Sequence, residues 1–308
     1  MSKIDEGKMY KIVEKKKIWF LISAAIIVVG IVFGCIWGLN FGIDFLGGSK
    51  VVLDCKEGFD KDKADEIVNK YVSDAVTNTV ENQEDGKKQY EIKSTSLDSE
   101  KFADLFTELK NDANIADEIA SQEEVGASFG ADLAKNSLIA LGIAFVAMLM
   151  YIAIRFEFKF GLAALIALVH DVLITLAFYA VSNMLINTPF VAAILTIIGY
   201  SINATIVIFD RIRENNKSMR TASTDNKINK SITQTMSRSV NTSLTTLFTI
   251  VAVSICVPSV REFALPIIVG ILSGTYSSIV IAPSIYSLLK NKSNKKKTTA
   301  VKSETVGV

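Results

Sequence analysis

The sequence predicts an α-helical polytopic membrane protein with six transmembrane helices and an α+β domain after the first helix. Hydrophobic residues make up 50% of the 308 residues and charged residues only 21%, and a mean hydropathy of +0.35 is high for a soluble chain. Six apolar stretches reach the length that a bilayer requires, which is about 20 residues. The polar stretch 40–136 separates the first of them from the rest and is long enough to fold by itself.

Composition also excludes several functional classes. A formal net charge of +1 gives no basic character of the kind that binds nucleic acid, so we expect no nucleic-acid partner. The single histidine excludes a multi-histidine metal site, and Cys35, Cys55 and Cys256 form no C-x-x-C pair. The patterns H-E-x-x-H, G-x-S-x-G and the P-loop are missing as well. We therefore expect no catalytic residue, no metal, no cofactor and no enzymatic activity.

The first transmembrane helix is predicted at 18–39, after a short N-terminal segment, 1–17. This stretch carries no charged residue over its 22 positions. A cleaved signal peptide would have a shorter apolar region that ends in small residues. Because the stretch ends in bulky Ile36, Trp37 and Leu39, we expect a membrane anchor that is not cleaved.

Five further transmembrane helices are predicted as a bundle over 137–289. They fall at 137–154, 160–181, 189–209, 237–257 and 264–289. The span at 237–257 is the least apolar of the six, and a full bilayer thickness carries it back to Arg238. A basic tail, 290–308, follows the last span.

Lysine and arginine residues predict that both ends of the chain are cytoplasmic. Six lysines precede residue 18, six follow residue 289, and the connection 210–236 holds six basic residues. The opposite connections, 182–188 and 258–263, hold none and one. Because short cytoplasmic segments are enriched in basic residues, residues 40–136 are expected on the extracytoplasmic side.

The extracytoplasmic stretch has the pattern of a ferredoxin-like domain. Residues 50–55 and 89–93 have the character of strands, and apolar residues at i, i+3, i+4 and i+7 predict helices around 64–71 and 102–109. The order strand, helix, strand, strand, helix, strand suits a ferredoxin-like fold. The 22 acidic and 11 basic residues give this stretch a charge of −11. A solvated surface explains this excess better than recognition of a basic partner.

Few ionisable residues fall inside the predicted spans, so each of them requires an explanation. An ionised side chain at the bilayer centre costs roughly 2.5–3.5 kcal/mol on insertion scales. His170 and Asp171 lie near the middle of the third span, and Arg238 lies at the cytoplasmic end of the fifth. One interpretation is a latch between helices, with Asp171 bonded to a nearby serine, threonine or Arg238. The other is a relay for protons or cations.

Uncharged polar residues mark the fourth span. Asn203 and Thr205 interrupt an aliphatic helix, either to bind neighbouring helices or to line a hydrated path. Neither side chain titrates, so they could coordinate an ion or water but could not carry a proton. Four charged residues follow where this span is predicted to leave the membrane, and they are expected to anchor the helix end, with docking of a cytoplasmic partner as the alternative. These residues are Asp210, Arg211, Arg213 and Glu214.

Three glycines follow the first span within seven residues. Gly42, Gly47 and Gly48 bracket Asp44 and Phe45. Glycines at this density indicate a tight turn or a close approach of two backbone segments. A phosphate-binding loop is disfavoured, because the segment has an acid and an aromatic residue and no lysine.

Seven sequence elements, in order from residue 42 to residue 279, resemble the SecF family. They cover nearly the whole chain. The elements are G-I-D-F-L-G-G at 42–48, V-G-x-x-x-G at 125–130, R-F-E-x-K-F-G-L-A-A-L-I-A-L-V-H-D-V at 155–172, I-L-T-I-I-G-Y-S-I-N at 194–203, V-I-F-D-R-I-R-E-N at 207–215, S-R-x-x-N-T-S-L-T-T at 237–246 and G-T-Y-S-S-I at 274–279.

The resemblance implies an auxiliary subunit of the Sec protein translocase in the bacterial cytoplasmic (inner) membrane. SecF proteins are the smaller partners of SecD, belong to the resistance-nodulation-division superfamily, and have six spans with a large external domain after the first. The implied partners are SecD, SecYEG and the translocating preprotein, with membrane lipid around the spans. The implied activity is the use of the proton motive force or another ion gradient to pull the preprotein outward.

One position departs from the family pattern. The family's fourth-span motif reads Y-S-x-N-D-T and its aspartate is the acid assigned to proton transfer, whereas this chain has Ala204. Arg238, the usual partner of that acid, is retained. Four explanations stay open: Asp171 takes over, SecD supplies the acid, the subunit is structural, or the alanine replaces a natural aspartate. The ion-coupling candidates are Asp171, His170, Arg238, Asn203 and Thr205.

Two other functional classes stay open beside ion-coupled export. The first is a structural subunit that stabilises SecD and SecYEG without carrying protons itself. The second is a drug or lipid exporter of the same superfamily, which would have two external domains and about twelve spans in one chain. Six predicted spans and one domain disfavour the exporter.

Overall fold

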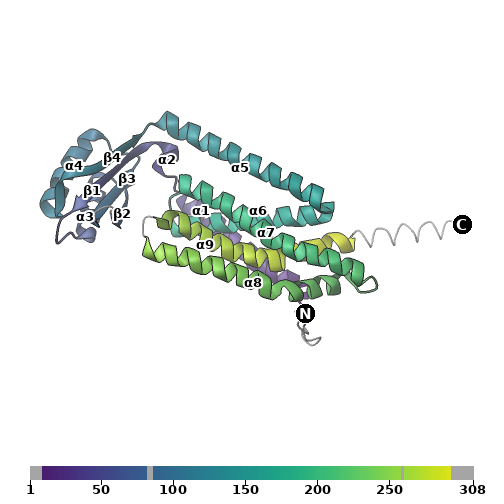
Figure 1. Cartoon of the computed structure of the whole chain (residues 1–308). Coiled ribbons are helices and arrows are strands. Elements are labelled where there is room, and N and C mark those ends of the chain that lie inside the picture. The colour runs from purple at the N-terminus through teal and green to yellow at the C-terminus, as the bar shows by residue number, and fades with distance from the viewer. Residues whose placement is uncertain (1–8, 82–85, 258–259, 293–308) are drawn as a thin grey trace.

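The computed structural model describes residues 9–81, 86–257 and 260–292, and within them it has six helices long and apolar enough to span a membrane. Figure 1 shows them as a bundle, with the α+β domain at one end. The fold class predicted from the sequence is confirmed. The helices are α1 (Lys16–Trp37), α5 (Ala127–Arg155), α6 (Phe158–Ser182), α7 (Thr188–Ser218), α8 (Thr224–Cys256) and α9 (Arg261–Tyr276). After α9, a π-helical turn, Ser277–Ile281, continues the same rod to residue 292.

Several helices extend beyond the apolar stretches that predicted them. α5 begins at Ala127, ten residues before the predicted span at 137, and α8 begins at Thr224, thirteen residues before 237. The α8 extension buries Ile228 and Ile232 against the rest of the bundle, so its apolar face is only a stripe. Hydropathy averaged over a bilayer thickness does not detect such a stripe. Residues 1–8 and most of the predicted tail, 293–308, lie outside the described residues.

The α+β domain is an antiparallel four-stranded sheet with two helices on one face. Its strand order, β2-β3-β1-β4, with one helix after β1 and one after β3, is that of a ferredoxin-like fold. The apolar side chains of both helices and of the inward face of β1 and β3 form a separate core. In chain order the elements are β1 (Gly48–Cys55), α3 (Lys61–Tyr71), β2 (Val76–Glu81), β3 (Lys88–Ser94), α4 (Ser99–Asp112) and β4 (Ile115–Val125).

The local sequence explains where the two helices of this domain begin. Asp60 accepts hydrogen bonds from the backbone N–H groups of Asp62 and Lys63, and Asp98 accepts one from that of Lys101. Aspartate is among the preferred N-cap residues, because its carboxylate satisfies N–H groups that the first turn leaves free.

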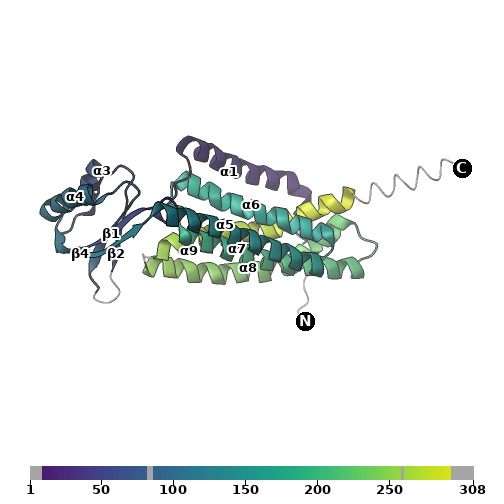
Figure 2. The same ribbon diagram turned by 90° about the horizontal axis from the view of Figure 1, so that it is seen from above.

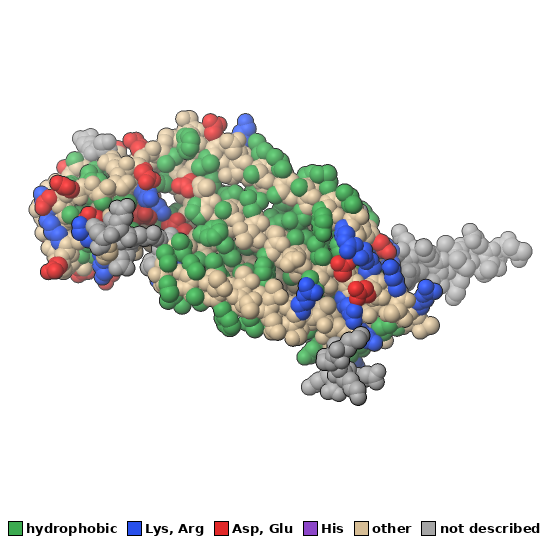
Figure 3. Space-filling model, viewed as in Figure 1, with side chains coloured by type: hydrophobic (Ala, Val, Ile, Leu, Met, Phe, Trp, Pro, Cys, Tyr) green, Lys and Arg blue, Asp and Glu red, His purple; other side chains and the backbone are tan. Residues whose placement is uncertain are grey.

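Three of the six membrane helices form the interior of the bundle and three lie around it. In the most apolar stretches of α6, α7 and the last helix, 44% to 67% of the residues are buried inside the protein. In those of α1, α5 and α8, at most 17% are buried. Figure 2, turned by 90°, shows α1 and α8 on opposite sides of the bundle. Many of the exposed side chains along these outer helices are apolar, as Figure 3 shows for one face, although α8 also exposes Asn241, Thr242 and Thr245. This arrangement suits a bundle surrounded by lipid.

The glycine-rich segment after α1 ties the α+β domain to the bundle. It contains one turn of helix, α2 (Ile43–Leu46), closed by Gly47 at φ +83°. The Gly42 N–H donates to the Ile186 carbonyl at 2.8 Å, and the Thr188 N–H donates to Asp44 Oδ2 at 2.9 Å. The close backbone approach that the glycines predict is therefore present, and it joins this segment to the connection between α6 and α7.

Candidate ion-coupling site

Asp171 lies in the interior of the bundle and is surrounded by serine hydroxyls. The side chain comes from α6, and the residue is only 1% exposed. Ser201 on α7 donates to Oδ2 at 2.6 Å, and Ser273 on α9 donates to Oδ1 at 2.7 Å. Ser277, at the start of the π-helical turn, donates to Oδ2 at 2.7 Å. Three hydroxyls from two neighbouring helices thus satisfy a carboxylate that has left water.

His170 extends this cluster to α1. Its Nδ1 lies 2.9 Å from Asp171 Oδ1 and its Nε2 lies 2.9 Å from Ser23 Oγ. Ser23 also contacts the Tyr276 hydroxyl at 3.3 Å, which in turn donates to the Trp19 carbonyl at 2.9 Å. A neutral imidazole can donate to Asp171 and accept from Ser23, and an imidazolium donates to both.

Close packing of the helices explains how several hydroxyls reach one carboxylate. A Cβ atom on Gly274 would lie 3.0 Å from Ser201 Cβ, and one on Gly270 would lie 2.2 Å from Ile197 Cγ1. α9 therefore packs on α7 through its two glycines. Small residues at helix contacts in membranes allow this close approach and bring short polar side chains together.

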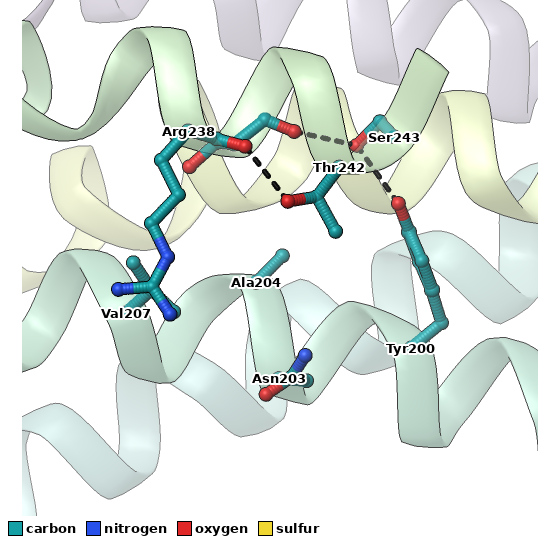
Figure 4. Close-up of a pocket in the computed structure, with 8 residues that line it drawn as sticks. Tyr200, Asn203, Ala204, Val207, Arg238, Thr242 and Ser243 are labelled. Atoms are coloured by element: carbon teal, nitrogen blue, oxygen red, sulfur yellow. Dashed lines mark hydrogen bonds between the residues drawn. The ribbon is translucent and has the colours of Figure 1, made fainter. Parts of the chain in front are cut away.

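Arg238 lies apart from this cluster, in a pocket between α7 and α8. The pocket has a volume of about 80 Å³ and is shown in Figure 4, where the guanidinium lies beside Val207 and the Ala204 methyl group points toward α8. No acidic side chain lines the pocket, and within the described residues Arg238 has no ion pair. The Ser239 hydroxyl is buried and has no hydrogen-bond partner in the part of the chain that the structure describes. The lining residues are Tyr200, Asn203, Ala204, Val207, Arg238, Ser239, Thr242 and Ser243.

The structure divides the ion-coupling candidates between these two places. Asp171 and His170 belong to the serine cluster, whereas Arg238 and Asn203 belong to the pocket. Of the partners expected for a latch at Asp171, serines are present and Arg238 is not. Thr205 is buried, at 2% exposure, and is not among the residues that line the pocket.

The four charged residues after the fourth span occupy a different place from the one expected. α7 continues to Ser218, so Asp210 lies eight residues before the helix end rather than at it. Arg213 lies 3.0 Å and Arg155 3.6 Å from Asp210 Oδ1, and Arg211 lies 2.6 Å from Glu214. Asp210 and Arg213 therefore link α7 to Arg155 at the end of α5, whereas the pair of Arg211 and Glu214 lies within α7. The apolar stretch ends at 209, but the helix has no reason to end there.

Sequence reasoning expected a serine as a partner of Asp171 but did not identify which serines supply the contacts. Ser201 lies in the element 194–203 and Ser277 in the element 274–279, whereas Ser273 belongs to no motif, nor does Ser23, the partner of His170. Serine is common in membrane helices, so only its distance from a buried acid gives it a function. As for metals, the described part of the chain has no group of three or more potential ligands.

Comparisons with known proteins agree on one family. A family model described as "Protein export membrane protein SecD/SecF, C-terminal" matches residues 104–292. The protein translocase subunit SecF of Calditerrivibrio nitroreducens is 38% identical over 90% of this chain and 93% of its own length. The protein translocase subunit SecDF of Bacillus subtilis is 32% identical over 92% of this chain, but the match spans only 38% of that longer protein.

Solved structures give the same result. A crystal structure of SecDF from Thermus thermophilus, described as a translocon-associated membrane protein, superposes with a TM-score of 0.79 at 32% identity. The superposition covers 94% of this chain and 40% of the SecDF chain. A second SecDF crystal structure, in a form called super-membrane-facing, has a TM-score of 0.72 at 30% identity and covers 97% of this chain and 41% of its own.

Proposed function

The chain belongs to the SecD/SecF family of protein-export membrane proteins, and from that premise we propose that it is an auxiliary subunit of the Sec protein translocase. Relatives named SecDF carry an equivalent of this chain within a longer one, which indicates association with SecD. With SecD, the subunit uses the transmembrane ion gradient to promote export of preproteins through SecYEG. It does so from the bacterial inner membrane, with both termini in the cytoplasm.

The observation that carries this proposal is the environment of Asp171. The buried carboxylate is held by hydroxyls and an imidazole, and no fixed cation among the described residues pairs with it. Hydroxyl groups can donate to a carboxylate and can also turn to accept from a carboxylic acid. The cluster therefore accommodates both protonation states, which is what an ion-coupling group requires. An arginine partner would instead hold the acid in its charged form.

The energy available is sufficient for a conformational step. One elementary charge that crosses the membrane potential releases about 2.3 kcal/mol per 100 mV. Reversing a two-state equilibrium from 1:99 to 99:1 needs about 5.5 kcal/mol. A few protons per cycle would thus drive a rearrangement of the α+β domain, if their transfer is coupled to its position.

A structural subunit is the second candidate, and the pocket at Arg238 favours it. Ala204 places a methyl group where a carboxylate could have paired with Arg238. On this alternative SecD supplies the titrating acid, or no acid is used, and the chain only stabilises its partners.

Export into inverted membrane vesicles tests the proposal. Vesicles containing this chain with SecD and SecYEG receive ATP and a preprotein, and the proton and sodium gradients are collapsed separately. We expect Asp171→Asn to lower the gradient-dependent part of export at least tenfold, because an amide cannot take up the proton. Asp132→Asn is a matched control, since Asp132 is an exposed acid of α5 with no ion pair among the described residues.

Two outcomes favour the structural candidate. The first is gradient-dependent export at the parental rate in Asp171→Asn, with the subunit still assembled. The second is no response to either gradient in any version of the chain. Ala204→Asp is a useful addition, because a gain of gradient dependence would show that the alanine weakens coupling at the Arg238 pocket.

A further inference from the structure

One acidic side chain at the boundary between the α+β domain and the bundle contacts both parts. Glu262, in the first turn of α9, has its Oε1 2.9 Å from Lys93 Nζ on β3. Its Oε2 accepts a hydrogen bond from Asn187 Nδ2 at 2.6 Å. Its backbone carbonyl accepts one from the Tyr179 hydroxyl on α6 at 3.4 Å. Glu262 therefore joins the domain to three places in the bundle.

On the side of the α+β domain, Lys93 is held in place for its ion pair with Glu262 by a second carboxylate. Lys93 also lies 2.9 Å from Glu91 Oε1, and its side chain is only 16% exposed. Burial lowers the pKa of Lys93, but the carboxylates of Glu262 and Glu91 outweigh it, so the pKa is raised. The other charged groups around this site are Lys50, which lies 3.6 Å from Glu91, and Arg261, which lines the same groove. Lys93 thus stays charged at physiological pH and holds Glu262.

On the bundle side, Glu262 lies at the N-terminal end of one helix that supplies hydroxyls to Asp171 and is hydrogen-bonded to the N-terminal end of the other. α9 carries Glu262 itself, and Ser273 lies eleven residues further on, about 16 Å along a helix. Asn187 is the N-cap of α7, where its Oδ1 accepts from the Phe190 N–H at 3.2 Å. α7 carries Ser201, another donor to Asp171. The Glu262 carboxylate thus belongs to the first turn of α9 and binds the N-cap of α7. Ser201 and Ser273, which bind Asp171, lie further along these two helices.

Beyond Pro266, the part of α9 that leads from Glu262 to Ser273 is closely packed on α7. α9 packs on α7 at Gly270 and Gly274 with no space for a side chain. Closely packed helices move as bodies rather than bend, so a shift near Asp171 is passed on to the helix ends. When Asp171 is protonated, a serine hydroxyl of α7 or α9 can turn from donor to acceptor, which reverses the direction of one hydrogen bond between that helix and α6.

We infer that Glu262 is a positioning residue that couples the placement of the α+β domain to the protonation state of Asp171. The inference rests on the proposed role of Asp171 as the titrating group. His170 is the only other titratable side chain that contacts Asp171 among the described residues, and the other groups facing it are the hydroxyls of Ser201, Ser273 and Ser277. Because coupling is reciprocal, Glu262 should also affect the titration of Asp171.

Distance measurements on the full chain in lipid nanodiscs test the inference. The three native cysteines are replaced by serine, and spin labels are attached at Lys63→Cys on α3 and Ser182→Cys at the end of α6, both exposed. We expect the distance distribution between the labels to shift with pH in the parent and to lose that shift in Asp171→Asn. Glu262→Gln should broaden the distribution and also lose the shift, because its amide N–H group would face the N–H group of Asn187.

A matched control separates coupling from general loss of charge. Glu123→Gln removes an exposed carboxylate of β4 whose ion pair, with Lys50 at 3.8 Å, lies within the same sheet. We expect Glu123→Gln to keep the parental pH shift. A parental pH shift in Glu262→Gln would overturn the inference.

Infrared spectroscopy of the same samples distinguishes failure of the inference from failure of the proposed function. A carboxyl band that is lost in Asp171→Asn reports protonation of Asp171. We expect the pH midpoint of this band to move by about 0.5 unit or more in Glu262→Gln. If the band titrates in the parent but the distance between the labels does not change with pH, the inference about Glu262 is wrong. The proposed titration of Asp171 would then still hold. If no such band titrates, the proposed role of Asp171 fails.

Discussion

At the scale of single residues, Asp171 and Glu262 show two ways to provide a carboxylate with hydrogen-bond donors. Asp171 is surrounded by hydroxyl groups, which can both donate and accept. Glu262 is fixed by an ammonium group and an amide N–H, which only donate. The first arrangement tolerates a change of protonation and the second resists one. This difference is the reason to assign ion coupling to Asp171 and positioning to Glu262.

Gly270→Ala should destabilise the bundle. The added Cβ would lie 2.2 Å from Ile197 Cγ1 and 2.4 Å from its Cδ1, so the two helices must separate or Ile197 must change rotamer. We expect a loss of about 1–3 kcal/mol in the free energy of unfolding. Reversible unfolding in mild detergent, followed by circular dichroism, measures this loss.

Gly142→Ala is the control for this prediction. Gly142 lies in α5, and a Cβ atom added there would have no neighbouring atom within 4 Å, so alanine should be neutral or stabilise by up to about 1 kcal/mol. Equal stability of the two variants would show that α7 and α9 are less closely packed than the structure shows. Combining Gly270→Ala with Ile197→Ala should recover part of the loss.

At the scale of elements, the connections decide how the helices and the domain are held. Asp74, between α3 and β2, fixes the connection between β3 and α4, where it accepts hydrogen bonds from Ser94 Oγ at 2.9 Å and from the Thr95 N–H at 2.8 Å. The hydroxyls of Thr95 and Ser96 donate to it as well. Burial raises the pKa of Asp74, but these donors outweigh it and lower the pKa to about 2.

Asp74→Asn should therefore destabilise the α+β domain in a pH-dependent way. A carboxylate whose pKa is lower in the folded state, about 2 against 3.8, stabilises the fold fully above its unfolded pKa. That contribution is lost as the pH falls through the folded value. We expect the stability difference between the parent and Asp74→Asn to be constant above pH 5 and to shrink between about pH 4 and pH 2. Urea unfolding at several pH values measures it, and a difference that does not change with pH would contradict this assignment.

At the scale of the whole molecule, charge separates the two ends of the bundle. Figure 3 shows basic side chains gathered at the end opposite the α+β domain. Arg155, Arg211 and Arg213 lie there, beside the extended ends of α7 and α8. Since basic residues are retained on the cytoplasmic side, the α+β domain should face the other side of the membrane.

Labelling of intact cells with a membrane-impermeant maleimide checks this orientation. In a chain without native cysteines, Asp62→Cys on α3 should react in intact cells, because it is exposed on the α+β domain. Asn226→Cys, exposed in the first turn of α8, should react only after the membrane is permeabilised. Labelling of Asn226→Cys and not of Asp62→Cys in intact cells would reverse the proposed topology.

The order of the amino acids was sufficient to predict the class of this protein, its six spans, the order of elements in its α+β domain and the acid within the third span. These features depend on apolar length, on local periodicity and on composition, and none of them requires knowledge of distant contacts. The ends of the helices were harder to predict, because α5, α7 and α8 continue past their apolar stretches as amphipathic or polar helices.

The contacts between residues far apart in the sequence could be learned only from the folded chain. Ser277 reaches Asp171 across 106 positions, and Lys93 reaches Glu262 across 169. Arg238, which the sequence left as a partner for Asp171, lies in a separate pocket instead. Serine, lysine and glutamate are too common for their spacing to identify such contacts. Their partners depend on how the helices pack, and that packing is set by glycines and apolar side chains along the same helices.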